Sequence, residues 1–159
     1  MPYIRIYVVE TLTPNVWYVG TTTREAHHRE REHAKGHGSL WTIIHGFKRM
    51  VFSQLVRTGT GCRLEDDLTL ALMYRYGWGA VRGGNFVARN NALMYRWLPP
   101  LLQGLAPTDV LPLHLRPVSK LPAELRALVD RFEVLCGFEH PNELHANALA
   151  EARLRGVTN

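Results

Sequence analysis

Five side chains within the first 65 residues are of the types that hydrolyse a phosphate ester. Tyr7, Tyr18 and His33 carry groups that can accept or pass on a proton. Arg29 carries a planar guanidinium that can hold a phosphate through two hydrogen bonds. Glu65 carries oxygen ligands of the kind that Mg²⁺ prefers. Such groups could activate water, stabilise charge on the phosphate oxygens and neutralise the leaving oxygen.

Each of these residues also has an ordinary structural explanation. Tyrosines on strands commonly cover a sheet and keep their hydroxyl groups in water. Glu25 lies four residues before Arg29, which is the spacing of a helical ion pair. Glu65, Asp66 and Asp67 would suit a helix N-terminus through the macrodipole, and for the two aspartates we favour that explanation. Residue type alone therefore does not decide the function.

An antiparallel hairpin is predicted at the start of the chain. Residues 3–9 alternate between apolar side chains and larger or charged ones, which is typical of a strand. Residues 13–15 predict a turn, and residues 16–20 return to extended character. This hairpin would place Tyr7 and Tyr18 on one face of the sheet.

A polar helix should follow the hairpin. Thr22 and Glu25 have the spacing of a capping box, and the residues up to Lys35 favour a helix that Gly36 ends. Within this helix the side chains at positions 29 and 33 lie one turn apart on the same face.

The remaining elements alternate in type. Residues 49–56 predict a third strand, and residues 64–76 a helix with apolar residues at helical spacing. The region 98–122 contains most of the prolines and predicts a connector. Helices are predicted over 91–102, 123–136 and 142–155. The second of these carries an apolar stripe formed by Leu125, Leu128, Val129, Phe132 and Leu135.

The order of these elements, together with the motifs that they carry, resembles the GIY-YIG nuclease family. The first 87 or so residues carry the resemblance, and the ordered set of motifs is more specific than any one of them. The motifs are Arg5-Ile6-Tyr7, Tyr18-Val19-Gly20, Arg29-x-x-x-His33, Gly38-Ser39-Leu40-Trp41-Thr42, Leu64-Glu65-Asp66 with Thr69, Tyr76-Gly77, and Val81-Arg82-Gly83-Gly84-Asn85-Phe86.

The resemblance implies an α+β fold in which helices flank a small, mainly antiparallel three-stranded sheet. We expect a nuclease-like domain over residues 1–90 and a helical extension over 91–159. The implied activity is hydrolysis of DNA phosphodiester bonds with Mg²⁺ or Mn²⁺, leaving a 5′-phosphate and a 3′-hydroxyl. The implied roles are water activation by Tyr7, Tyr18 and His33, phosphate binding by Arg29 and metal binding by Glu65.

Further residues are expected to contact nucleic acid. Gly83 and Gly84 permit tight turns and close approach of the backbone, and their neighbours Arg82 and Asn85 would contact phosphate or brace the site. Trp41 is expected in the core. The full set of expected contacts is Arg5, Arg24, Lys35, Thr42, Arg82 and Asn85.

One position departs clearly from the family pattern. Arg5 stands where the first triplet calls for glycine, so it would either contact DNA or mark a site that has changed its use. An alternative is therefore a catalytically inactive module of the same fold that binds nucleic acid or protein, for example as an accessory factor of a mobile element. A third alternative is a structural metal site built on His27, His28, His33 and His37, which we discount because Gly36 should interrupt the helix.

Charge and composition narrow the choice of partner. The net charge is +5 and the isoelectric point about 9.6, which favours a polyanion. Residues 1–90 hold 12 basic and 7 acidic residues, whereas 91–159 hold 7 of each, so DNA should meet the first part. The helical remainder could pack on the first part of the chain, mediate dimerisation or contact another protein.

The sequence also suggests a compartment. Two cysteines, Cys62 and Cys136, suit neither a disulfide framework nor a zinc site. No secretory signal or membrane span is evident, so we expect an intracellular, cytoplasmic protein.

Overall fold

A four-stranded mixed sheet forms the centre of the fold. The computed structural model describes residues 3–109 and 121–136. The strands are β1 (Tyr3–Thr11), β2 (Trp17–Thr22), β3 (Phe47–Arg57) and β4 (Val81–Gly83), in the order β3-β1-β2-β4. The α+β class and the predicted hairpin are confirmed, but the prediction of three strands is incomplete. The additional strand, β4, is only three residues long and pairs with β2 in parallel.

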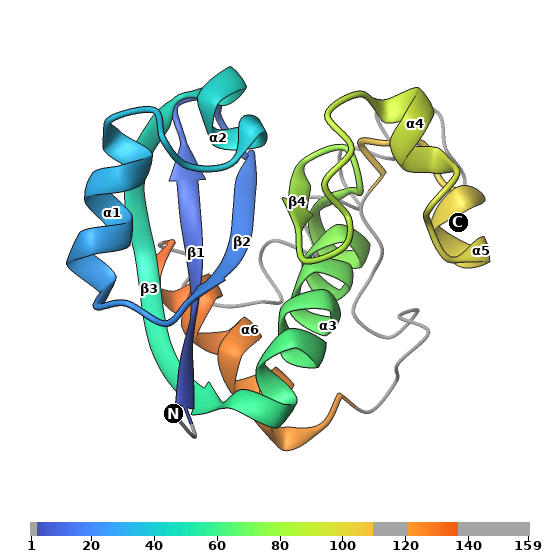
Figure 1. Ribbon diagram of the computed structural model, residues 1–159. Coiled ribbons are helices and arrows are strands. Elements are labelled where there is room, and N and C mark those ends of the chain that lie inside the picture. Colours follow the sequence, from blue (N-terminus) through green and yellow to red (C-terminus); the bar gives the residue numbers. More distant parts are fainter. Residues whose placement is uncertain (1–2, 110–120, 137–159) are drawn as a thin grey trace.

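Helices cover the sheet on both faces (Figure 1). The described helices are α1 (Ala26–Ala34), α2 (Leu40–His45), α3 (Thr58–Tyr76), α4 (Asn91–Tyr95), α5 (Pro100–Gln103) and α6 (Ala123–Leu135). Four successive residues of β1, from Ile6 to Val9, are fully buried. Because successive side chains point to opposite faces, this run shows that both faces of the strand are covered.

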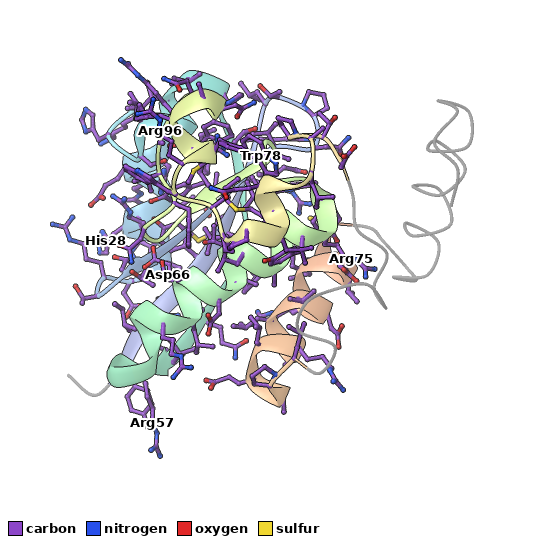
Figure 2. The ribbon with its side chains drawn as sticks, turned by 90° about the vertical axis from the view of Figure 1, so that its right-hand side faces the viewer. His28, Arg57, Asp66, Arg75, Trp78 and Arg96 are labelled. Carbon is purple, nitrogen blue, oxygen red and sulfur yellow. The ribbon has the colours of Figure 1, made fainter. Side chains whose placement is uncertain are left out.

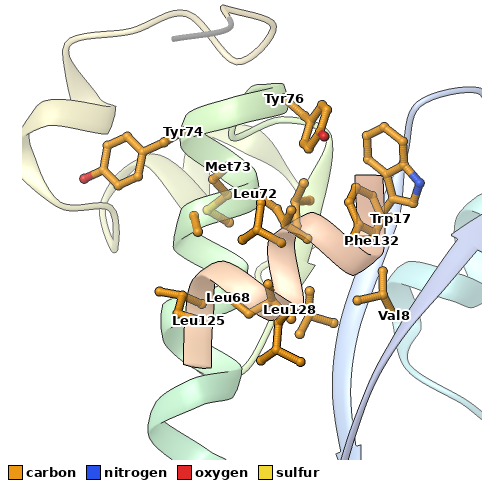
Figure 3. Packing of buried hydrophobic residues seen from close by; sticks show 14 of the residues in the cluster. Val8, Trp17, Leu68, Leu72, Met73, Tyr74, Tyr76, Leu125, Leu128 and Phe132 are labelled. Carbon is orange, nitrogen blue, oxygen red and sulfur yellow. The ribbon is translucent and has the colours of Figure 1, made fainter. Parts of the chain in front are cut away.

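The main core lies between the sheet and the pair of helices α3 and α6 (Figure 3). Phe132 of α6 meets the Trp17 ring of β2 edge-on, with ring centroids 5.3 Å apart. The predicted stripe on α6 is confirmed at the four positions from Leu125 to Phe132, whereas Leu135 is 40% exposed. The C-terminal helix therefore completes the core of the N-terminal sheet, because both belong to one hydrophobic cluster.

A buried ionic contact joins the same two helices. Arg75 near the end of α3 donates from Nε to Glu133 Oε1 of α6 at 2.8 Å, and the Tyr76 hydroxyl donates to the same oxygen at 3.0 Å. Both charged side chains are almost fully buried. Removing one partner alone would leave a buried charge without its main compensation.

Three predicted helix boundaries are wrong. Helix α3 begins at Thr58 rather than at residue 64, so Asp66 and Asp67 lie far from its N-terminus and the macrodipole does not explain them. Thr22 belongs to β2, and Glu25 caps α1 without a side-chain hydrogen bond, so the capping box does not form. The predicted helix over 91–102 is divided into α4 and α5, because proline restricts the residue before it.

The predicted connector is partly structured. Residues 100–103 form α5, and both Leu98 and Leu102 are buried in the core cluster. The helix predicted over 142–155 lies outside the described residues. No helix in the described ranges is long and apolar enough to span a membrane.

Candidate active site

The two tyrosines lie together on the face of the sheet that α1 covers. Tyr7 of β1 pairs in register with Gly20 of β2, and Val9 with Tyr18. The phenol rings are 6.4 Å apart between centroids, so the predicted shared face is confirmed. Gly20 makes this packing possible, because a Cβ atom there would lie 2.5 Å from Tyr7 Cζ and 3.0 Å from Tyr18 Cε2.

Helix α1 brings an arginine and a histidine to the same phenol. Arg29 donates from Nε to the Tyr7 hydroxyl oxygen at 2.9 Å. His33, one helical turn further on, places Nε2 3.0 Å from that oxygen. The Tyr7 hydroxyl is therefore held between a fixed cation and an imidazole.

The second ring nitrogen of His33 determines the direction of this hydrogen bond. The Thr42 hydroxyl donates to the carbonyl oxygen of Ser39 at 2.9 Å and lies 3.1 Å from His33 Nδ1. Because that carbonyl oxygen takes the hydroxyl proton, we assign the ring proton of His33 to Nδ1, which donates to Thr42 Oγ1. Neutral His33 then has a lone pair on Nε2, which accepts the proton of the Tyr7 hydroxyl.

Burial sets the charge states within this chain. It lowers the pKa of His33 to about 4, and the nearby Arg29 charge adds to the effect, so the ring is neutral at neutral pH. Burial also raises the pKa of Tyr7 and of Tyr18. Arg29 acts in the opposite direction on both phenols because its charge favours the phenolate.

Glu65 of α3 approaches this group from the edge of the sheet. Strand β4 pairs only with Trp17–Val19 of β2, so Thr21 lies beyond the paired stretch and donates its hydroxyl to Glu65 Oε2 at 3.1 Å. Burial raises the pKa of Glu65, while hydrogen bonds from Thr21 and from the backbone of Gly84 oppose the rise. The Glu65 carboxylate in turn raises the pKa of both phenols through its charge.

The loop that contains Gly84 and Asn85 is hydrogen-bonded to Glu65 and to Asp66. The Asp66 side chain accepts hydrogen bonds from the backbone N–H and the side-chain Nδ2 of Asn85, both at 2.8 Å. Gly84 has a φ of +52° and lies against Asp66, a conformation and a closeness that favour glycine. Sequence reasoning assigned Asp66 to a helix terminus and missed this role, although the glycine pair did predict a turn.

Arg82 of β4 has no exposed surface. It donates to the carbonyl oxygens of Ala88 at 2.6 Å and Trp78 at 2.7 Å, and to Asn91 Oδ1 at 2.9 Å. Its guanidinium carbon lies 4.4 Å from the ring centroid of Trp41, and burial lowers its pKa to about 10. This placement leaves Arg82 no surface for the expected phosphate contact, and it acts as a brace instead.

Thr42 is also placed differently from the expectation. Its side chain is buried and its hydroxyl is engaged by His33 and Ser39, so it has no surface to offer DNA. Trp41 lies in the core as predicted and donates from Nε1 to the carbonyl oxygen of Trp17 at 3.0 Å.

The exposed charges pair in a pattern that the helical spacing did not predict. Arg29 pairs with Glu32 instead of Glu25, and Glu32 also pairs with Arg24. Glu25 pairs with Arg5 of β1 at 3.3 Å. These contacts give α1 a network of partly exposed ion pairs beside the phenols, each of which contributes little to stability.

The other expected contacts and ligands are at the surface. Lys35 and Asn85 are exposed. The exposed rings of His27 and His28 lie 4.2 Å apart, but no three His, Cys, Asp or Glu side chains of the described residues come together as a metal site. Cys136 is a free, half-buried thiol whose pKa burial raises to about 12.

The structure thus joins four predicted side chains directly, namely Tyr7, Tyr18, Arg29 and His33. Glu65 reaches the same sheet through Thr21, which follows Gly20 on β2. Comparison with protein-family models, with curated proteins and with solved structures gives no match. A function is therefore inferred from the chemistry of this neighbourhood.

Proposed function

We propose that this protein is a metal-dependent endonuclease that hydrolyses DNA phosphodiester bonds by a GIY-YIG-type mechanism. The observation that carries the proposal is the hydrogen-bonded chain from Arg29 through Tyr7 to His33, with Glu65 beside it. A base, a phosphate-binding cation and a carboxylate in one place are the groups that this hydrolysis requires.

The proton path follows from the hydrogen-bond directions. Tyr7 donates to His33 Nε2, so its oxygen can accept a proton from an attacking water as its own proton moves to the imidazole. The Thr42 hydroxyl holds the ring in the required tautomer through Nδ1. Tyr18 lies beside Tyr7 and would orient the water or the phosphate.

Arg29 would bind the phosphate that is cleaved. Its Nε bonds Tyr7 and its Nη1 bonds Glu32, and the side chain keeps part of its surface exposed. The guanidinium also opposes the rise in the Tyr7 pKa that burial causes. It can therefore stabilise both a phenolate and a phosphate oxygen.

Glu65 would be the metal ligand. Within the described residues it has no ion-pair partner, and burial raises its pKa, so a cation would stabilise its charged form. Mg²⁺ keeps several waters and needs as few as one or two protein carboxylates. When bound, Mg²⁺ or Mn²⁺ would polarise the phosphate and neutralise charge on the leaving oxygen.

The second candidate is an inactive module of the same fold that binds nucleic acid or protein. The complete burial of Tyr7 favours it, because burial raises the pKa of the phenol and keeps water away from it. Arg5 also favours it, since the residue that replaces the family glycine is engaged by Glu25.

The test is cleavage of supercoiled plasmid with and without Mg²⁺ or Mn²⁺. Three chains are compared: the natural sequence, Glu65→Gln, and the control Asp67→Asn two residues along the same helix, where the carboxylate is 41% exposed. We expect metal-dependent nicking by the natural sequence and the control, and a loss of about 100-fold or more in Glu65→Gln.

Gel retardation of DNA in the same samples separates the two candidates. If Glu65→Gln retains binding while cutting is abolished, the nuclease is supported. If the natural sequence retards DNA but leaves the plasmid intact at every protein and metal concentration, the binding module is correct and the proposal fails. Salt must be varied, because phosphate contacts weaken steeply as ionic strength rises.

A further inference from the structure

The short helix α4 and the residues beside it expose aromatic and apolar surface that the proposed reaction does not use. Tyr95 is 46% and Trp97 51% exposed, although aromatic rings of this size are usually more buried. Leu93 and Leu101 are also more than 40% exposed. We call the group formed by Arg89, Tyr95, Arg96 and Trp97 the α4 surface.

The stretch of chain around α4 is positively charged. Residues 68–108 contain four arginines and no acidic residue. Arg75 and Arg82 are buried, whereas Arg89 and Arg96 are exposed. In residues 3–109 and 121–136, no carboxylate pairs with either exposed arginine. Exposed cations and exposed aromatic rings within one short stretch of the chain match an anionic partner that also offers flat apolar groups.

The α4 surface is held firmly from behind. Arg82 donates to Asn91 Oδ1 at the first residue of α4, and Asn90 caps the helix by accepting from the Leu93 N–H at 2.8 Å. Met94 and Leu98 are buried in the core. The exposed rings therefore project from a fixed support, so binding would restrict little conformational freedom.

Arg96 of the α4 surface lies on the same side of the molecule as Asp66, the neighbour of Glu65 in α3 (Figure 2). The chain also links the two regions directly, because Asn85, which Asp66 holds beside Glu65, precedes α4 by only six residues.

We propose that the α4 surface binds DNA beyond the scissile phosphate, with Arg89 and Arg96 on phosphates and Tyr95 and Trp97 stacked on unpaired bases. This inference rests on the proposed function, and it assigns as substrate a DNA that has a single-stranded part next to the cleaved duplex. Aromatic stacking requires bases whose faces are free, whereas a continuous duplex offers only edges and backbone.

The experiment measures binding by fluorescence anisotropy in the presence of EDTA, so that no cleavage occurs. The probes are a labelled duplex and the same duplex extended by a single-stranded arm. The variants are Trp97→Ala and the pair Arg89→Ala/Arg96→Ala. The matched controls are Tyr3→Ala, where the ring is 49% exposed on β1, and Arg126→Ala on the exposed face of α6.

The natural sequence should prefer the DNA with the arm. Trp97→Ala should weaken binding to that DNA about fivefold or more and change duplex binding much less. The arginine pair should reduce the slope of log affinity against log salt by about 0.7–0.9 for each phosphate that is no longer bound. The two controls should leave both quantities unchanged.

Three results would overturn the inference. If Trp97→Ala binds both probes like Tyr3→Ala while the natural sequence still cuts plasmid, the α4 surface does not bind DNA and the nuclease stands. If the natural sequence binds neither probe, the DNA partner itself is wrong. If Trp97→Ala changes only the molar mass measured by light scattering, the surface joins two copies of the chain.

Discussion

Tyr7 is the residue on which the proposed chemistry depends most directly. Its hydroxyl accepts from Arg29 and donates to His33, so Tyr7→Phe removes two hydrogen bonds and keeps the ring. We expect plasmid cleavage to fall by about 100-fold or more, because the proton path is interrupted. The free energy of unfolding should fall by only about 1–2 kcal/mol, the cost of unpaired buried groups.

The control for this change is Tyr3→Phe, which removes a hydroxyl from an exposed ring. It should alter neither activity nor stability. Cleavage by Tyr7→Phe at the natural rate would show that the phenol takes no part in the reaction.

The lowered pKa of His33 predicts how the free energy of unfolding should depend on pH. Its pKa is about 4 in the folded protein and about 6.5 in the unfolded chain, so the unfolded chain binds more protons between these values. The stabilising contribution is complete above about pH 6.5 and declines as the pH falls toward 4. Its upper limit is about 3 kcal/mol.

Urea unfolding of the natural sequence and of His33→Gln, at several pH values from about 4.5 to 7, tests this dependence. The natural sequence should lose stability on acidification more steeply than the variant. Glu65 acts in the opposite sense, since its raised pKa makes its contribution fall as the pH rises, but it is present in both chains. Parallel pH profiles would contradict a depressed pKa at His33.

At the scale of elements, the loop between β4 and α4 depends on one buried side chain. Arg82 satisfies carbonyl oxygens at Trp78 and Ala88, reaches Asn91 and stacks on Trp41. Lysine cannot reproduce this planar set of contacts. We expect Arg82→Lys to lower the free energy of unfolding by about 2 kcal/mol or more.

The same variant should also reduce cleavage, because the loop holds Gly84 and Asn85 behind Glu65 and Asp66. Urea midpoints and plasmid assays measure the two effects. The matched control is Arg126→Lys on α6, whose side chain is exposed, and it should change stability by less than about 0.5 kcal/mol. Equal stability of the two variants would show that Arg82 is not a brace.

At the scale of the whole molecule, the N-terminal sheet and α6 should unfold together. Leu128 of α6 is fully buried. It belongs to one hydrophobic cluster with residues of α3, β1 and β2. Leu128→Ala should cost about 2–5 kcal/mol, whereas Leu135→Ala at the exposed end of α6 should cost much less.

Circular dichroism and tryptophan fluorescence during urea unfolding measure this coupling. Coincident transitions at a lower urea concentration are expected for Leu128→Ala. If the sheet retained its natural midpoint while a helical signal disappeared early, α6 would be a separate unit. Such a result would support the division at residue 90 that the sequence suggested.

Much of the fold could be predicted because its signals are local. Alternation over residues 3–9 and 16–20 indicated the hairpin, and that hairpin brought Tyr7 and Tyr18 to one face. Helical spacing then placed Arg29 and His33 one turn apart, as they are in α1. These relations involve neighbours in the chain, so backbone geometry alone determines them.

The tertiary structure decided which distant groups meet. The Arg82 guanidinium lies over the Trp41 ring, and Asp66 accepts a hydrogen bond from the Asn85 side chain. The spacing of these residues in the sequence does not indicate either pair. Arg29 also pairs with Glu32 rather than with Glu25. Such pairings depend on how whole elements pack, because burial, charge and available hydrogen-bond partners are properties of the assembled chain and not of a spacing along it.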